Sequence, residues 1–192
     1  MNPEAISAII AVVDALESLD IPYYIGGSVA SSAHGVVRST LDADIVAELQ
    51  LRHVAPLFAM LHDKYYLNEN TMREAIQRRS CFNMIYLPTM FKVDVFVTKD
   101  RPYNRTAFQK IQTKVFDEET GRKFNVASPE DTILAKLEWY RLGDEISDRQ
   151  WNDILGVMKV QQNALDRAYL EKWAVELGVN DLLAKAWAET NT

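Results

Sequence analysis

Three aspartates are the residues whose types and spacing most strongly suggest chemistry. Asp42 and Asp44 stand two positions apart between apolar residues, and Asp94 lies alone in the apolar run at residues 91–97. Alternate side chains along a strand point to one face, so Asp42 and Asp44 would share a face. Two buried carboxylates side by side repel each other and lose hydration, and a cation removes that cost. The pattern therefore predicts a Mg²⁺ site that a third carboxylate from a neighbouring strand completes.

Each of these aspartates also has a purely structural interpretation. Asp42 could face solvent at the end of a strand. Asp94 could form a salt bridge with Lys92 or with an arginine instead of binding a metal.

A glycine-serine turn precedes the aspartate pair. Gly26 and Gly27 end a short apolar segment, and Ser28 stands near the start of an expected short helix. Backbone N–H groups at such a turn, together with the helix dipole, favour an anion. The turn is a candidate phosphate cradle, although Gly-Gly-Ser also marks ordinary turns.

Hydrophobic periodicity predicts the elements that position these residues. A hairpin is expected around residues 117–121. The expected helices before residue 127 are 4–18, 28–33, 53–63 and 71–79, and the expected strands are 23–25, 42–49, 82–87, 91–98, 110–116 and 123–127.

The chain changes character at Ser128, where a cap residue, a proline and two acids mark a helix start. Helices are expected at 129–142, 147–162, 166–177 and 180–189. We therefore expect an α+β fold, with a small mixed β-sheet flanked by helices over residues 1–127 and a C-terminal helical bundle over residues 128–192.

Composition is that of a globular protein. The 192 residues are 48% hydrophobic and 25% charged, and the single cysteine, Cys81, excludes an intramolecular disulfide. No apolar run approaches the length of a membrane span, and the N-terminus lacks a basic signal-peptide region. We expect a cytoplasmic protein with no membrane partner.

Charge is distributed unevenly. The net charge of −6 argues against non-specific nucleic-acid binding. Residues 73–114, however, carry nine Lys or Arg and three acids, whereas residues 1–50 carry seven acids and only Arg38. The basic segment could face a phosphate-rich substrate or could be an ordinary solvated surface.

Taken together, Gly27-Ser28, Asp42-Ala43-Asp44 and the later Asp94 resemble the nucleotidyltransferase superfamily related to DNA polymerase β. The segments at residues 24–30, 34–44, 128–137 and 148–154 are similar to the AbiEii-type toxin group and its stand-alone relatives. The resemblance covers roughly residues 5–160. It implies a nucleotidyltransferase core in the first part of the chain.

The resemblance also implies roles for individual residues. Asp42 and Asp44 would bind two Mg²⁺ ions, and Asp94 would bind one of them and help deprotonate the attacking hydroxyl. The nucleotide triphosphate would be held by the glycine-serine turn and two cations: Gly26, Gly27, Ser28, Arg38 and Lys136.

Several of these assignments have alternatives. Arg38 could instead pair with a nearby acid, and Lys136 could be a helix lysine at the solvent edge. Asp153 could be a structural acid, and His34 more plausibly packs against the turn than acts as a base. The spacer between Ser28 and Asp42 is long for the family, and the acid-rich run after the second aspartate is absent.

The sequence thus favours a Mg²⁺-dependent enzyme that moves a nucleoside monophosphate from an NTP to a hydroxyl of tRNA or of a protein. The resemblance implies a toxin–antitoxin or phage-defence setting, with a cognate antitoxin or toxin as partner. One alternative is a small-molecule enzyme of the aminoglycoside-modifying kind. The other is a non-catalytic nucleotide-binding or partner-binding module.

Overall fold

The computed structural model describes residues 3–117 and 121–190 and divides into two compact units. The first unit contains the chain up to Gly26 and again from Ser39 to Val126. The second contains residues 27–38 and the chain from Ala127 onward.

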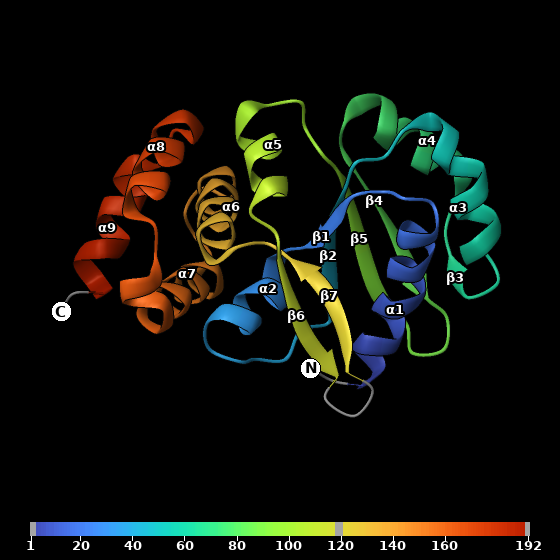
Figure 1. Cartoon of the computed structure of the whole chain (residues 1–192), viewed down its shortest axis with the longest axis horizontal. Helices are drawn as coiled ribbons and strands as arrows, with labels where there is room; N and C mark the ends of the chain where they lie inside the picture. Colours follow the sequence, from blue (N-terminus) through green and yellow to red (C-terminus); the bar gives the residue numbers. More distant parts are fainter. Residues whose placement is uncertain (1–2, 118–120, 191–192) are drawn as a thin grey trace. The chain divides into compact units, whose positions relative to one another are not determined.

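The first unit is built on a seven-stranded mixed sheet, counted over the described residues, in the order β3-β4-β5-β2-β1-β7-β6 (Figure 1). Pairing is parallel between β1 and β7 and between β2 and β5, and antiparallel at the other four contacts. The strands are β1 (Tyr23–Ile25), β2 (Asp42–Ala47), β3 (Tyr65–Tyr66), β4 (Cys81–Tyr86), β5 (Phe91–Val97), β6 (Gln112–Asp117) and β7 (Arg122–Val126).

Buried and partly exposed side chains alternate along the central strands, so one face of the sheet is covered by helices. In β2 and β5 every second residue is buried, including Ala43, Ile45, Val93 and Val95. Helix α1 packs against both strands, and α3 lies beside α1 (Figure 1). The helices of this unit are α1 (Pro3–Ser18), the short 3₁₀ turn η1 (Leu51–His53), α3 (Val54–Leu61), α4 (Glu69–Arg78) and α5 (Pro102–Gln109).

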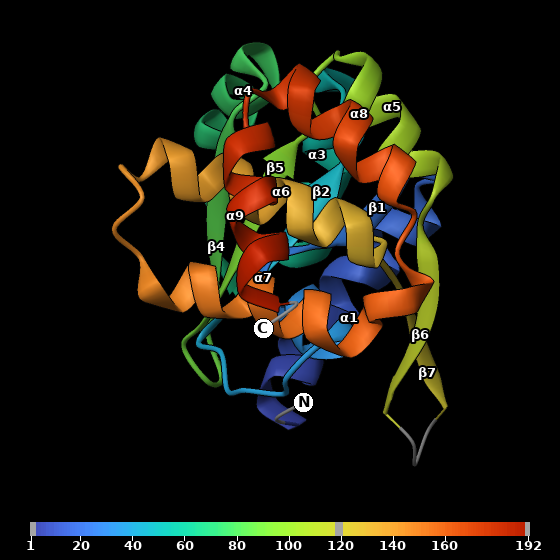
Figure 2. The same cartoon turned by 90° about the vertical axis from the view of Figure 1, so that its left-hand side faces the viewer.

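The second unit is helical. Helix α2 contacts α6 and α7, α6 also contacts α7 and α8, and α9 contacts α7 and α8 (Figures 1 and 2). Its elements are α2 (Gly27–His34), α6 (Pro129–Leu142), α7 (Asp148–Gln161), the 3₁₀ turn η2 (Gln162–Ala164), α8 (Arg167–Leu177) and α9 (Asn180–Thr190). The Ser128 side chain accepts a hydrogen bond from the Asp131 N–H at 3.0 Å, so the predicted helix start is confirmed.

The predicted α+β class is confirmed, and the elements named in the sequence analysis occur within a few residues of their expected bounds. Strands β6 and β7 pair as a hairpin, whose expected turn at 118–120 lies outside the described residues. Among the strands and α-helices of the described residues, the two-residue strand β3 and helix α5 were not predicted, and neither were the two 3₁₀ turns.

The two units divide the chain differently from the expected boundary at 127/128. Residues 27–38 group with the C-terminal helices, because α2 packs closely on α7. At Gly35 a Cβ would lie 2.8 Å from the Val157 nitrogen and 3.0 Å from the Gly156 carbonyl carbon. Only glycine permits this approach, so the contact depends on one residue.

Among the helices that the structure describes, none combines the length and the apolar character that crossing a membrane requires.

Candidate active site

Strand pairing brings the three predicted aspartates to one face of the sheet in the first unit. In the parallel β2–β5 pair, Asp44 is opposite Asp94, and Asp42 is opposite Lys92. The residues between them point to the buried face, so these four side chains share the other face. We call Asp42, Asp44, Lys92 and Asp94 the carboxylate face.

Lys92 is the cation of the carboxylate face. Its Nζ lies 2.7 Å from Asp94 Oδ2 and 4.0 Å from Asp42 Oδ2. The hydrogen bond that it donates to Asp94 raises the pKa of the Lys92 ammonium above its ordinary value. Thr40 Oγ1 donates a hydrogen bond to Asp42 Oδ1 at 2.8 Å, which fixes a second carboxylate. The salt bridge that the sequence left open for Asp94 therefore exists.

The chemistry of the carboxylate face fits a hard divalent cation, because three carboxylates offer only oxygen ligands. Within the described residues, however, no group of three or more His, Cys, Asp or Glu side chains is arranged to hold a metal ion. The ammonium of Lys92 neutralises part of the carboxylate charge there. A metal bound to Asp94 Oδ2 or Asp42 Oδ2 would compete with Lys92, whose ammonium lies 2.7 Å and 4.0 Å from these two oxygens.

The glycine-serine turn is divided between the two units. The Gly26 N–H donates to the Asp44 carbonyl at 2.8 Å, so it extends the β1–β2 pairing and is not free for a phosphate. Gly27 has a φ of 53°, which glycine adopts without strain, and it begins α2 with Ser28 in the first turn. Of the predicted phosphate cradle, only Gly27 and Ser28 at the N-terminus of α2 remain candidates for binding phosphate through their N–H groups.

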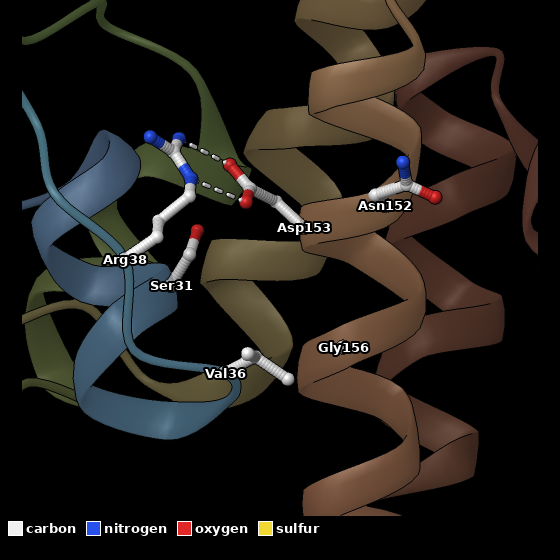
Figure 3. A pocket seen from close by; sticks show the side chains of 6 residues that line it. All are labelled: Ser31, Val36, Arg38, Asn152, Asp153 and Gly156. Carbon is white, nitrogen blue, oxygen red and sulfur yellow. Dashed lines mark hydrogen bonds and ion pairs between the residues drawn. The ribbon is translucent and has the colours of Figure 1, made fainter.

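The second unit holds a cluster that the sequence did not assemble. Arg38 donates to Asp153 from Nε at 2.8 Å and from Nη2 at 2.7 Å (Figure 3), and Lys136 Nζ lies 2.8 Å from Asp153 Oδ2. The Arg38 Nη2 group also donates to Ser28 Oγ at 2.5 Å. We call Ser28, Arg38, Lys136 and Asp153 the basic cluster.

Two side chains of the basic cluster are buried, whereas Arg38 is 24% exposed. The side chains of Asp153 and Lys136 are 8% and 9% exposed, so the alternative of a solvent-edge Lys136 is wrong. Burial acts to raise the pKa of the Asp153 carboxyl, but hydrogen bonds and charge from Arg38 and Lys136 outweigh it and hold that pKa below its ordinary value. Two cations thus share one carboxylate, and the cluster carries one net positive charge.

A pocket of about 230 Å³ adjoins the basic cluster within the same unit. Figure 3 shows its lining side chains, with the Arg38 guanidinium turned toward Asp153. The pocket is lined by Ser31, Val36, Arg38, Asn152, Asp153 and Gly156. His34 is buried, and its Nε2 donates a hydrogen bond to the Ala127 carbonyl at 2.7 Å, so its partner is the backbone before α6.

The basic segment at residues 73–114 gives little support for a phosphate-facing surface. Arg73 pairs with Glu69 on α4, and Arg105 pairs with Asp100. These local pairs suit the alternative of an ordinary solvated surface.

Comparison with known proteins identifies the fold. No protein-family model matches the sequence, and no curated protein matches it either. Among solved structures, the antibiotic-resistance factor ANT(2'')-Ia matches with a TM-score of 0.56 at 14% identity, over 100% of this chain and 97% of that chain. The chain has the nucleotidyltransferase fold.

Two further structures with the nucleotidyltransferase fold are similar. The lincosamide antibiotic adenylyltransferase LnuA, solved with lincomycin bound, matches with a TM-score of 0.53 at 13% identity, over 83% of this chain and 98% of that chain. A nucleotidyltransferase-like protein from Paracoccidioides brasiliensis matches with a TM-score of 0.52 at 17% identity, over 81% and 75%. The AbiEii-type subgroup stays a prediction from the sequence.

Proposed function

We propose that this protein is a nucleotidyltransferase that moves a nucleoside monophosphate from an NTP to an acceptor hydroxyl. One observation carries the proposal: Asp42, Asp44 and Asp94 share one face of paired strands in a nucleotidyltransferase fold. The strand register, and not the sequence spacing alone, brings Asp94 opposite Asp44.

In this proposal Asp42, Asp44 and Asp94 hold Mg²⁺, which supplies charge neutralisation at the phosphoryl group and at the leaving oxygen. The acceptor oxygen attacks the α-phosphorus, a new P–O bond forms, and the bond to the β-phosphate oxygen breaks with release of pyrophosphate. Asp94 takes the proton of the acceptor hydroxyl on a carboxylate oxygen. Lys92 must leave Asp94 for this, because an oxygen that accepts its hydrogen bond is a poorer proton acceptor.

The basic cluster and the N-terminus of α2 are the proposed phosphate contacts. The first N–H groups of α2, at Gly27 and Ser28, suit phosphate oxygens. Arg38 and Lys136 add one more positive charge than Asp153 balances. Asp153 is a positioning residue, since it orients both cations and touches no substrate in this account.

For the acceptor, we propose a small hydroxylated molecule, as in enzymes of the aminoglycoside-modifying kind, in place of the tRNA or protein that the sequence favours. ANT(2'')-Ia, which matches over the whole of this chain, has been solved with adenylyl-2''-tobramycin, and LnuA with lincomycin. The chain after residue 123 also carries twelve acids against seven bases, which suits a cationic acceptor. A tRNA or protein acceptor and a toxin–antitoxin setting stay predictions of the sequence.

Label transfer tests the proposal. The protein is incubated with Mg²⁺ and each of four α-labelled NTPs, with a panel of aminoglycosides and lincosamides, with tRNA, or with lysate protein. Label on a small acceptor supports both the reaction and the proposed acceptor. Label on tRNA or protein supports the reaction but overturns the small acceptor. No transfer to any acceptor, with no pyrophosphate release, would leave the non-catalytic module as the better interpretation.

A further inference from the structure

Lys92 stands where a metal-binding face would be expected to carry only acids. It follows from the strand register that Lys92 is opposite Asp42 and two positions before Asp94 on the same face. Its ammonium contacts one oxygen of Asp94 closely and lies 4.0 Å from an oxygen of Asp42. The lysine therefore contacts one of the three proposed metal ligands and lies at ion-pair distance from a second.

A lysine and a metal ion cannot use the same oxygen at full strength. Mg²⁺ binds carboxylate oxygens at about 2.0–2.1 Å, and a second cation at hydrogen-bond distance from that oxygen is repelled. The Lys92 side chain is 43% exposed, and a four-carbon stem lets its ammonium move into water. Displacement of the lysine therefore requires no change in the sheet.

We propose that Lys92 is a displaceable counter-ion, which neutralises the carboxylate face before metal arrives and is released when metal binds. This inference rests on the proposed metal role of Asp42, Asp44 and Asp94. The lysine stabilises the metal-free face against carboxylate repulsion and lowers its affinity for metal alone. Metal then binds best together with the NTP, whose phosphates supply further oxygen ligands.

A Mn²⁺ titration of the full chain without nucleotide, followed by electron paramagnetic resonance, tests this directly. Lys92→Met removes the charge and keeps a side chain of similar length, so we expect Mn²⁺ to bind roughly tenfold more tightly than in the wild type. Lys92→Arg, which keeps the charge, should bind Mn²⁺ about as the wild type does. Lys99→Met is the matched control, because Lys99 is exposed beyond the end of β5, and it should leave the affinity unchanged.

The outcomes separate the two proposals. Equal or weaker Mn²⁺ binding by Lys92→Met, while Asp44→Asn abolishes it, overturns the counter-ion inference and leaves the metal site intact. No Mn²⁺ binding by the wild type or by Lys92→Met overturns both.

A second measurement uses only the wild-type protein, so it does not depend on the folding of a variant. Acetylation of wild-type lysines is followed by peptide mass spectrometry with and without Mn²⁺. The inference requires Lys92 to react faster when Mn²⁺ is present, because its ammonium has left Asp94, while Lys99 reacts as before. An unchanged or slower reaction at Lys92 contradicts the inference.

Discussion

The carboxylate face and the basic cluster are ion-pair networks of opposite sign. The first sets three carboxylates against Lys92, and its side chains range from Asp94 at 15% exposed to Lys92 at 43%. The second sets Arg38 and Lys136 against the buried Asp153. In each, the minority charge holds the majority charges in place.

The difference in burial determines which charged groups each network can release. A partly exposed network can release its counter-ion and accept a cation from water at modest cost. A buried network cannot lose its carboxylate, because two desolvated cations would remain unpaired. The first is therefore suited to bind a metal reversibly, and the second to present a fixed positive charge to an anion.

Loss of an acid from the carboxylate face should give the largest functional effect. Asp44→Asn keeps the shape and removes one metal ligand, so we expect nucleotidyl transfer to fall at least about a hundredfold. The stability should not fall, since carboxylate repulsion is also removed. Transfer rates and urea unfolding of Asp44→Asn, with the exposed Asp100→Asn as control, check both points. Transfer at the wild-type rate by Asp44→Asn would refute the assigned role.

Loss of the acid from the basic cluster should mainly reduce the stability of the fold. Asp153→Asn leaves Arg38 and Lys136 without their shared carboxylate, so we expect the free energy of unfolding to fall by about 3 kcal/mol. Asp148→Asn, at an exposed position on the same helix, should change it by less than about 0.5 kcal/mol. Urea denaturation compares the two, and equal stability of the variants would show that the buried pairing contributes little.

The α2–α7 contact offers a test that changes no charge. Gly35→Ala places a methyl group 2.8 Å from the Val157 nitrogen, so we expect a loss of about 2 kcal/mol from overpacking. Gly143→Ala is the matched control, because its Cβ would meet no atom closer than 3.4 Å. Thermal unfolding of both variants decides, and a fully stable Gly35→Ala protein would contradict the close approach of these helices.

The smallest expected effect is a change in the pH dependence of stability. The pKa of Asp153 is lower in the folded chain than its ordinary value of 3.8, so its contribution is fully present above that value and is lost as the pH falls through the lower folded pKa. The stability advantage of the wild type over Asp153→Asn should stay constant from about pH 7 to about pH 5 and shrink below about pH 4. Urea denaturation at several pH values measures it, and an advantage that does not change with pH would refute the shift.

Local patterns in the sequence predicted most of the fold. Apolar runs with period two identified the strands that carry Asp42, Asp44 and Asp94, and the cap at Ser128 located α6. Strand β3 has only two residues, too few for a period. Helix α5 begins at Pro102, a residue that suits the first helical position, but it has only eight residues, which is little more than two turns.

The environment of the site residues depended on contacts that no local pattern contains. The sequence indicates Lys92 only as a possible partner of Asp94, because its distance from Asp42 depends on the β2–β5 register. No local pattern links Asp153 to Arg38, because the two residues are 115 positions apart in the chain. Charged side chains between apolar neighbours were the signal in both cases, but only the folded chain shows their partners.

We propose that the carboxylate face binds metal and that the basic cluster binds phosphate. Equilibrium binding of an NTP analogue with a non-cleavable α–β bridge, with Mg²⁺ or with EDTA, tests it in the wild type, Asp44→Asn and Lys136→Met. We expect EDTA to weaken binding to the wild type but not to Asp44→Asn, and Lys136→Met to bind more weakly in both conditions. Binding that is equal in all three proteins and unaffected by EDTA would contradict both proposed roles.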